Sequence, residues 1–318
     1  MKAQISSREG HAPVSVVLLA GGTGGTKLAH GFSVLPEVEL TVIANVGDDL
    51  EIHGHLVCPD IDALLYTLSG LLDTGQGWGV RDDTHTAHAM FERLGAPTWF
   101  RIGDADLAVH AHRAELLAAG ATLTDAVAAM ATALGVGTRI LPATDQPHRT
   151  MIETDDGSLE FQEYFVRRGQ EPEVRGVSFE GDGLPTDAVL AAIDGAELIV
   201  IGPSNPIVSI GPILALPGIE ESLQAAEAPV VAVSPIIAGR ALKGPADRML
   251  ASLGHESSAL GVARLYDGLV RHLVIDEADA ELDRQIETET AMSVTVLPTV
   301  MRTDDDRAGL ARSLLGLA

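Results

Sequence analysis

Four aspartates in two short segments are the residues of this sequence best suited to chemistry. Asp48 and Asp49 directly follow an apolar run, and Asp60 and Asp62 close the segment HGHLVCPDID, residues 53–62. Carboxylates supply oxygen donors, and no histidine or cysteine pair stands at a typical metal-binding spacing, which suits Mg²⁺ rather than Zn²⁺. Mg²⁺ usually takes one or two carboxylates and completes its shell with water and phosphate. The four aspartates therefore predict a magnesium site, unless Asp48 and Asp60 merely cap helices.

A glycine-rich segment precedes these acids. Residues 16–31, VVLLAGGTGGTKLAHG, indicate a buried strand, a turn and the start of a helix. Glycine lets a backbone approach a ligand closely, and a helix N-terminus offers free N–H groups, so the segment predicts an anion or phosphate site. The spacing matches neither GxGxxG nor GxxxxGK[ST]. The alternative is a tight turn that binds nothing. The candidate ligands of the anion are Gly21, Gly22, Thr23, Gly24 and Lys27.

Two later loops also follow apolar runs. GPSNPIVSIG, residues 202–211, brings Ser204 and Asn205 to a strand end, where they could contact a base or a ribose, or form a rigid turn. SPIIAGRALKGP, residues 234–245, carries Arg240 and Lys243. In a chain this acidic, cations at a strand end are candidate partners of a diphosphate, although exposed cations often do nothing specific.

Histidine and cysteine give weaker signals. No HExxH or other clear metal-binding spacing is present, and His85 and His88 fit a solvated helix face. His110 and Arg113 follow the segment Gly103-Asp104-Ala105-Asp106 and would share one side of a helix. Cys58 is the sole cysteine, which excludes an intrachain disulfide and fits a reducing cytosol. Without a defined base, Cys58 is not a convincing nucleophile.

These residues need a scaffold, and the pattern of strands and helices predicts one. An apolar strand, a helix and a second strand over residues 16–45 form a βαβ unit, which implies a parallel sheet whose ligands lie beyond the carboxyl ends of the strands. We expect an α/β protein with a doubly wound, Rossmann-like and mostly parallel sheet, and an inserted α+β subdomain. The predicted parts are a disordered tail (1–13), the core (14–75 and 181–318) and the insertion (76–180). The predicted elements are strands at Leu40–Asn45, Met151–Thr154, Leu159–Val166, Val174–Phe179, Leu198–Ile201, Pro229–Val233, Val270–Ile275 and Ser293–Val296, and helices at Ala63–Leu72, capped by Asp60 or Asp62, Glu220–Ala226 and Asp304–Leu317.

Composition narrows the class of protein. The 318 residues carry a formal net charge of −24, which argues against binding to nucleic acid or to an anionic membrane. No apolar run reaches membrane-spanning length and no secretory leader pattern opens the chain, so a cytoplasmic protein is expected. Lys2, Lys27 and Lys243 are the only lysines, and two of them stand in the glycine-rich segments described above.

Taken together, the motifs resemble those of the 2-phospho-L-lactate transferases of coenzyme F-420 biosynthesis, including their actinobacterial phosphoenolpyruvate-transferring relatives. The similarity runs in order across most of the chain, and its longest stretch is specific. The matching stretches are AGGTGGTKL (20–28), NVGDDLEIHG (45–54), VCPDID (57–62), GWG (77–79), GDADLAVH (103–110), ILPATDQP (140–147), FQEYFVRR (161–168), GPSNPIVSIGPILALPG (202–218) and SPIIAGRALKGPA (234–246).

The resemblance implies a reaction. A guanosine diphosphate ester of lactate or enolpyruvate (lactyl- or enolpyruvyl-2-diphospho-5'-guanosine) would give its substituted phosphoryl group to a ribityl hydroxyl of the deazaflavin Fo. GMP would be released, F-420-0 or dehydro-F-420-0 would form, and Mg²⁺ would be required. By the same resemblance, Asp49 and Asp62 would act as the catalytic metal ligands, supported by Asp48 and Asp60. The glycine segment, Ser204, Asn205 and Lys243 would hold the guanosine diphosphate end. The Fo acceptor would lie near Asp62, Asp104, Asp106 and His110, and the protein would be a homodimer.

Two departures and one rival bear on this interpretation. The family commonly has an arginine where Ala105 stands and a hydroxyl residue where Ala63 stands, so Arg101 or Arg113 would have to substitute for the missing arginine. The rival is a non-catalytic, nucleotide-sugar-binding regulator of the gluconeogenesis-factor type. Such proteins typically follow the acids with a glycine-serine run, whereas Leu50 follows Asp49 here. An NAD-dependent oxidoreductase is disfavoured because GxGxxG is absent.

Overall fold

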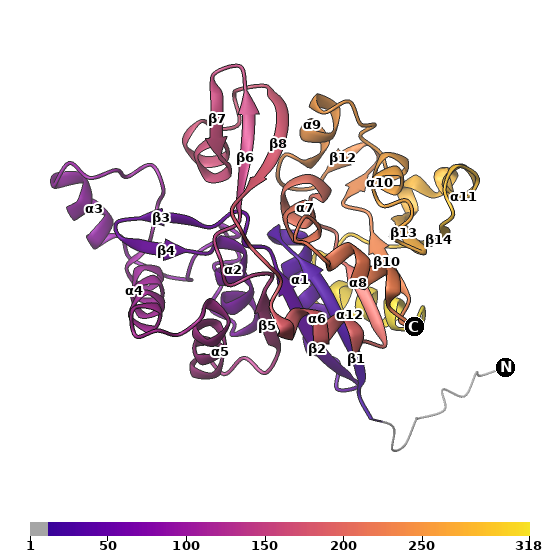
Figure 1. The fold of residues 1–318 in the computed structure, drawn as a ribbon, viewed down its shortest axis with the longest axis horizontal. Coiled ribbons are helices and arrows are strands. Elements are labelled where there is room, and N and C mark those ends of the chain that lie inside the picture. The colour runs from indigo at the N-terminus through magenta and orange to yellow at the C-terminus, as the bar shows by residue number, and fades with distance from the viewer. Residues whose placement is uncertain (1–11) are drawn as a thin grey trace.

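A seven-stranded parallel sheet forms the centre of the molecule (Figure 1). The computed structural model describes residues 12–318, so most of the predicted disordered tail lies outside the described residues. The strand order is β14-β13-β10-β9-β1-β2-β5, and each neighbouring pair is parallel. The strands are β1 Val14–Ala20, β2 Val38–Ala44, β5 Arg139–Pro142, β9 Leu198–Ile201, β10 Val230–Val233, β13 His272–Asp276 and β14 Ser293–Leu297.

The sheet is doubly wound, as the sequence predicts. From β1 the chain builds outward through β2 to β5, then returns to the other side of β1 and continues through β9, β10, β13 and β14. The direction of winding reverses between β1 and β9. Ligands of open α/β sheets bind in the crevice beyond the carboxyl ends of the strands at such a reversal. The residues that follow β1, β2 and β9 are therefore the ones to inspect.

Helices cover both faces of the sheet because successive strand residues point to opposite sides. In β1, Val16 and Leu18 face one apolar core, and Val17 and Leu19 face the other. The first core is covered by α1 Gly22–Ser33, α2 Pro59–Leu68, α5 Leu123–Ala133 and α12 Asp304–Leu315. The second is covered by α6 Asp187–Asp194, α7 Gly211–Leu214, α8 Ile219–Ala225, α9 Ala246–Ser252, α10 Ala259–Leu265 and α11 Asp283–Glu289.

Smaller units surround the carboxyl edge of the sheet. In Figure 1 a three-stranded antiparallel sheet stands at the top, and the lobe with α3 and α4 extends to the left. The antiparallel sheet contains β6 Arg149–Thr154, β7 Gly157–Glu160 and β8 Val174–Glu180, with the π-helical segment Glu163–Arg167. The lobe contains the hairpin β3 Leu50–Ile52 and β4 His55–Val57, together with α3 Thr86–Arg93 and α4 Asp104–Ala118. The remaining short elements are the hairpin β11 Ile236–Ile237 and β12 Arg240–Ala241, the π-helical segment Pro206–Ile210 and the 3₁₀ segment Glu277–Leu282.

The structure differs from the sequence-based expectation in four places. The range 76–180 is not a separate insertion throughout, because β5 pairs with β2 in the main sheet. Residues 50–57 form a hairpin that is absent from the predicted elements. The predicted strand Leu159–Val166 ends at Glu160 and continues as a π-helical turn. The predicted helix Ala63–Leu72 begins earlier, at Pro59, so Asp60 and Asp62 lie inside its first turn and do not cap it.

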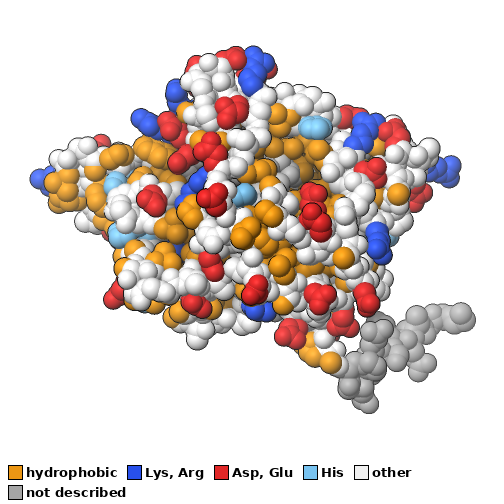
Figure 2. Space-filling view, viewed as in Figure 1, with side chains coloured by type: hydrophobic (Ala, Val, Ile, Leu, Met, Phe, Trp, Pro, Cys, Tyr) orange, Lys and Arg blue, Asp and Glu red, His pale blue; other side chains and the backbone are white. Residues whose placement is uncertain are grey.

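The surface reflects the composition. Figure 2 shows acidic side chains spread over the visible face, with Lys and Arg side chains mostly toward its margins. Among residues 12–318, no helix combines the length and the apolarity that crossing a membrane would require.

Two glycines of α1 let the helix pack directly on the loop that follows β9. A Cβ atom on Gly24 would overlap the carbonyl oxygen of Pro203, and one on Gly25 would lie 2.7 Å from Oγ of Ser204. Gly24 and Gly25 are helical, so the segment predicted as a ligand-binding turn is largely the first turns of α1. At these two positions, glycine serves the contact between helix and loop.

We predict that Gly24→Ala lowers the free energy of unfolding by ~1–3 kcal/mol, because the added methyl group forces α1 away from Pro203. Gly309→Ala in α12 is the matched control, since a Cβ there meets nothing within 4 Å. Alanine in that open helical position should stabilise by roughly 0.5–1 kcal/mol. Urea denaturation of both variants measures the difference, and equal stabilities would contradict the packing account.

Candidate functional site

Asn45 joins two of the four aspartates beyond the carboxyl end of β2. The side chain is fully buried, and its Nδ2 donates to Oδ1 of Asp48 at 2.9 Å and to Oδ2 of Asp60 at 2.9 Å. Its own Oδ1 accepts a hydrogen bond from the backbone N–H of Gly47 at 2.8 Å. The two acidic segments, separate in the sequence, therefore meet on a single amide group. We call Asn45, Asp48 and Asp60 the acid pair with its amide.

The acid pair also reaches the glycine segment. The backbone N–H of Gly22, the first residue of α1, donates to Oδ1 of Asp60 at 2.6 Å. A Cβ on Gly21 would lie 2.7 Å from Oδ2 of Asp60, so the close approach depends on glycine. The N-terminus of α1, which the sequence predicts as an anion or phosphate site, donates in this structure to the side chain of Asp60. Gly21, Gly22 and Asp60 form one contact at the point where the strand order reverses.

Burial raises the pKa of both acids of the pair. For Asp48, burial acts first and the neighbouring Asp60 carboxylate adds to it, so its pKa lies well above the ordinary value. For Asp60, burial raises the pKa while the hydrogen bonds from Asn45 and Gly22 oppose the rise. Two buried carboxylates this close cannot both stay ionised without a counter-charge. The arrangement favours either a bound proton or a bound cation.

Asp49 is a buried carboxylate with spare hydrogen-bonding capacity. It is 4% exposed, and its Oδ1 has no hydrogen-bond partner among the described residues. Burial raises its pKa from 3.8 to about 7, and the positive charge of Arg149 partly offsets that rise. An acid with a pKa near neutrality can hold or release a proton under physiological conditions, as a general base requires.

The raised pKa of Asp49 predicts a pH dependence of stability. From its ordinary value of 3.8 up to about 7, the native state keeps a proton that the unfolded chain has released. The free energy of unfolding should therefore fall as pH rises through this window, and level off above it. Asp49→Asn removes this contribution, so the stability of the variant relative to the parent should rise between about pH 4 and about pH 7 and stay constant above that range. Denaturant unfolding at several pH values measures this, and parallel profiles would refute the pKa shift.

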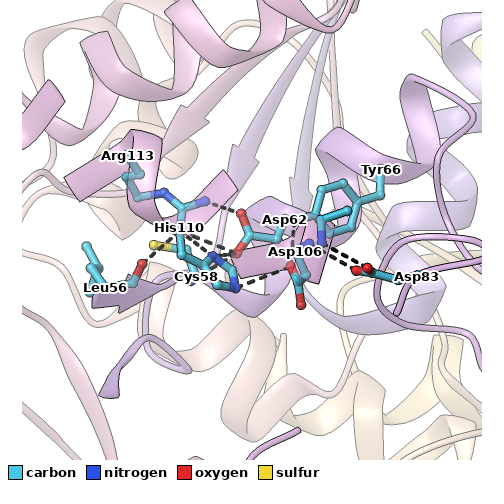
Figure 3. Close-up of polar contacts among 9 residues, drawn as sticks. Leu56, Cys58, Asp62, Tyr66, Asp83, Asp106, His110 and Arg113 are labelled. Carbon is cyan, nitrogen blue, oxygen red and sulfur yellow. Dashed lines mark hydrogen bonds and ion pairs between the residues drawn. The ribbon is translucent and has the colours of Figure 1, made fainter. Parts of the chain in front are cut away.

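Asp62 lies in a second buried network, shown in Figure 3. Arg113 of α4 is fully buried and forms an ion pair with Oδ1 of Asp62 through its Nη2. The same guanidinium donates through Nη1 to the carbonyl oxygen of Leu56 in β4 at 3.0 Å. The backbone N–H of Cys58 donates to Oδ2 of Asp62 at 3.2 Å. This ion pair ties α4, β4 and α2 together, and it already supplies Asp62 with a cation.

The network continues along α4. Tyr66 donates its hydroxyl to Oδ1 of Asp106 at 2.6 Å, and Nε2 of His110 lies 3.2 Å from the same oxygen. His110 is 1% exposed, and its Nδ1 lies 3.5 Å from Oδ2 of Asp62. Hydrogen bonding to His110 lowers the pKa of Asp106 against the opposing effect of burial. Asp106 and His110, expected at the acceptor site, are thus occupied by contacts within the protein.

The carboxylate of Asp104 lies at the start of α3 rather than in the buried network of Asp106 and His110. It accepts hydrogen bonds from the backbone N–H groups of Thr86 and Ala87 at 3.0 and 2.8 Å, at the start of α3. The pKa of Asp104 is lowered to about 2. The hydrogen bond from the Thr84 hydroxyl has the largest effect, and the backbone hydrogen bonds from Ala87 and Thr86 add to it. In return, Asp83 accepts from the first N–H groups of α4 at 2.8 and 3.0 Å. Asp104 of α4 thus satisfies the start of α3, and Asp83, just before α3, satisfies the start of α4, so Asp104 has a clear structural role.

The remaining predicted nucleotide-binding residues are Ser204, Asn205, Lys27, Lys243 and Thr23. The hydroxyl of Ser204 is buried and has no hydrogen-bond partner among the described residues. Asn205 accepts from the backbone N–H of Ile207 at 2.9 Å and caps the short segment that follows. Lys27 donates to the carbonyl oxygen of Met301 at 3.0 Å. The pKa of Lys27 is lowered, first by burial and then by the positive charges of Arg307 and Lys243. Thr23 stands in the first turn of α1.

Three residues of this region had no assigned role in the sequence analysis. Asn45 was predicted only as the end of a strand, although an amide directly before the first acidic segment was a usable signal. Arg149, whose charge acts on Asp49, opens β6 and belongs to no motif. Tyr66 lies in α2 and belongs to none of the candidate motifs. Arg113, considered as a substitute for a missing ligand-binding arginine, is buried against Asp62.

Within residues 12–318, no three or more His, Cys, Asp or Glu side chains are arranged to hold one metal ion. The four aspartates instead form two groups. Asp48 and Asp60 share Asn45, whereas Asp62 pairs with Arg113. Asp49 interacts electrostatically with both groups.

The fold and this site define a doubly wound α/β protein with buried carboxylates at the reversal point of its sheet. The family model described as 2-phospho-L-lactate transferase CofD matches residues 16–305. The chain belongs to this family of transferases, as its motifs predict.

Individual relatives are similar in sequence over nearly the whole chain. A 2-phospho-L-lactate transferase of Methanothermobacter thermautotrophicus is 40% identical over 302 residues, 95% of this chain and 97% of the relative. A phosphoenolpyruvate transferase of Streptomyces griseus is 39% identical over 312 residues, 95% of this chain and 98% of the relative. A crystal structure of a Bacillus halodurans protein of the UPF0052 family has a TM-score of 0.65 at 18% identity, covering 96% of this chain and all of that one (100%), and supports the fold.

Proposed function

We propose that this protein transfers a 2-phospholactyl or phosphoenolpyruvyl group from its guanosine diphosphate ester to the deazaflavin Fo, with release of GMP. The observation that carries the proposal is the acid pair with its amide at the N-terminus of α1, in a chain that matches the transferase family over residues 16–305. Curated relatives bear both the phospholactate and the phosphoenolpyruvate name, so the proposal keeps both groups.

Mg²⁺ fits the donor set of this site. The available atoms are carboxylate oxygens, burial raises the pKa of Asp48 and Asp60, and the buried Oδ1 of Asp49 lacks a partner among the described residues. A divalent cation would relieve the repulsion between these carboxylates, and Mg²⁺ needs only one or two of them. We propose Asp48 and Asp60 as its ligands. Asp62 could join them only if it separated from Arg113.

The cation would neutralise charge on the diphosphate as the bond to GMP breaks. Side chains of the protein would accept the proton of the attacking hydroxyl and neutralise the phosphates of the donor. Asp49, with a pKa of about 7, lies at the right acidity to accept the proton of the attacking hydroxyl. Lys27 and Lys243 are cations available to the diphosphate of the donor and to the GMP that leaves. Phosphoryl transfer requires mainly positioning and charge stabilisation. The carboxylates and lysines of this site would provide both.

The experiment that tests the proposal is a GMP-release assay with Fo and each guanylylated donor. We expect release that requires Fo, a donor and Mg²⁺ together, and that stops when a chelator removes the metal. Release without Fo would indicate a hydrolase, and no release with either donor would refute the proposed transfer. A protein that binds a nucleotide sugar and turns nothing over would support the regulator instead.

A further inference from the structure

The loop between α2 and α3 is held in one shape by its own hydrogen bonds. Oδ1 of Asp73 accepts from the backbone N–H groups of Gly75 and Gln76 at 2.8 and 3.1 Å, and the Asp73 carbonyl oxygen accepts from Gly77 at 2.8 Å. The N–H of Asp73 donates to the carbonyl oxygen of Gly79 at 3.0 Å. Gly77 and Gly79 have φ values of +81° and +71°, which side chains rarely tolerate. The loop is therefore built, at some conformational cost, around the residue between these glycines.

That residue is Trp78, whose side chain is left uncovered. Trp78 is 44% exposed and stacks on no aromatic ring among the described residues. The other tryptophan, Trp99, is less exposed, and its ring lies 5.8 Å from that of Phe100. A tryptophan on a rigid loop loses little conformational entropy when a flat ligand stacks on it. The indole of Trp78 has the exposure and rigidity of a stacking surface.

Cations lie beside this loop. Nζ of Lys243 lies only 2.7 Å from the position that a Cβ on Gly77 would take, so the lysine crosses directly over the loop. Lys243 and Arg307 both act electrostatically on Lys27, which places three cations in one neighbourhood. In a chain with 45 acidic residues and 21 lysines and arginines, such a grouping favours a phosphorylated ligand. A stacking surface and cations together suit a planar base that carries phosphates.

We propose that Trp78 stacks on the base of the donor nucleotide, while Lys243 and Lys27 contact its phosphates. The inference rests on the proposed function, which supplies a guanosine diphosphate donor. Fo is also planar, but it carries a ribityl chain without phosphate and would leave the cations unused. The donor base therefore fits this place better than the acceptor ring does. Gly77 keeps the space that Lys243 occupies over the loop.

Because the chain has only two tryptophans, fluorescence of single-tryptophan variants can test this proposal directly. Trp99→Phe leaves Trp78 as the only indole, and Trp78→Phe leaves Trp99 as the only one. Titration with GDP should quench tryptophan emission saturably in Trp99→Phe and change it little in Trp78→Phe. Calorimetry should show GDP binding weakened about tenfold by Trp78→Ala, with Trp78→Phe within about threefold of the parent, because either aromatic ring can stack.

The outcomes separate the inference from the proposed function. If the parent binds GDP and releases GMP, and Trp78→Ala binds GDP as tightly as the parent, the stacking role of Trp78 is refuted while the transferase stands. If Fo rather than GDP quenches Trp78 and its binding depends on Trp78, the surface belongs to the acceptor and the inference is overturned. If the parent neither binds GDP nor releases GMP, the proposed function falls, and the inference with it.

Discussion

Asp49→Asn is expected to lower the rate of GMP release by on the order of 10²–10³-fold. The substitution keeps the size of the side chain but removes the carboxylate that would accept the proton of the Fo hydroxyl. Because burial raises the pKa of Asp49 to about 7, losing its charge should not unfold the protein. Steady-state GMP release with saturating donor and Fo is the measurement.

The matched control is Asp155→Asn, which alters an exposed aspartate paired with Arg175 on the small sheet. Its rate should equal that of the parent. Circular dichroism and thermal unfolding of both variants separate lost chemistry from lost structure. If Asp49→Asn retained a near-native rate in a folded protein, Asp49 would have no part in the reaction.

Arg113→Leu is expected to lower the free energy of unfolding by ~3–5 kcal/mol, because it leaves the carboxylate of Asp62 buried without its cation. Chemical denaturation of the variant and of the parent measures it.

Two further variants test whether the unpaired carboxylate of Asp62 causes this loss of stability. A double variant, Arg113→Leu with Asp62→Leu, should recover much of the lost stability, because it leaves no unpaired charge. Arg175→Leu removes an exposed ion pair with Asp155 and should change stability little. If the single Arg113→Leu variant were as stable as the parent, the buried ion pair would not join α4 to the site.

Much of the fold could be predicted because buried parallel strands are short apolar runs with clear ends. Leu198–Ile201 and Val230–Val233 were recognisable in this way, and each is completely buried in the sheet. The strand β5 was assigned to an insertion, since nothing in its four residues shows that they pair with β2. The hairpin at 50–57 has strands of only three residues, too short for alternation to be visible.

For the site, the sequence predicted that the aspartates lie near one another but not which groups they contact. Asp48 and Asp49 follow β2 at the carboxyl edge of the sheet, so their place in the fold was predictable. The division of the four aspartates was not, because it depends on Asn45 and on Arg113, which the fold brings from other segments. The expected phosphate position at α1 shows the same limit, since the sequence reveals an N-terminus but not that the carboxylate of Asp60 lies on it.

The central claim is that these buried acids serve transfer of a substituted phosphoryl group to Fo. Mass spectrometry of Fo after incubation with the protein, Mg²⁺ and each guanylylated donor tests it most directly. The account predicts that the mass of Fo increases by a phospholactyl or phosphoenolpyruvyl group while GMP accumulates in equal amount. Unmodified Fo with both donors, under conditions where the protein is folded and binds GDP, would contradict it.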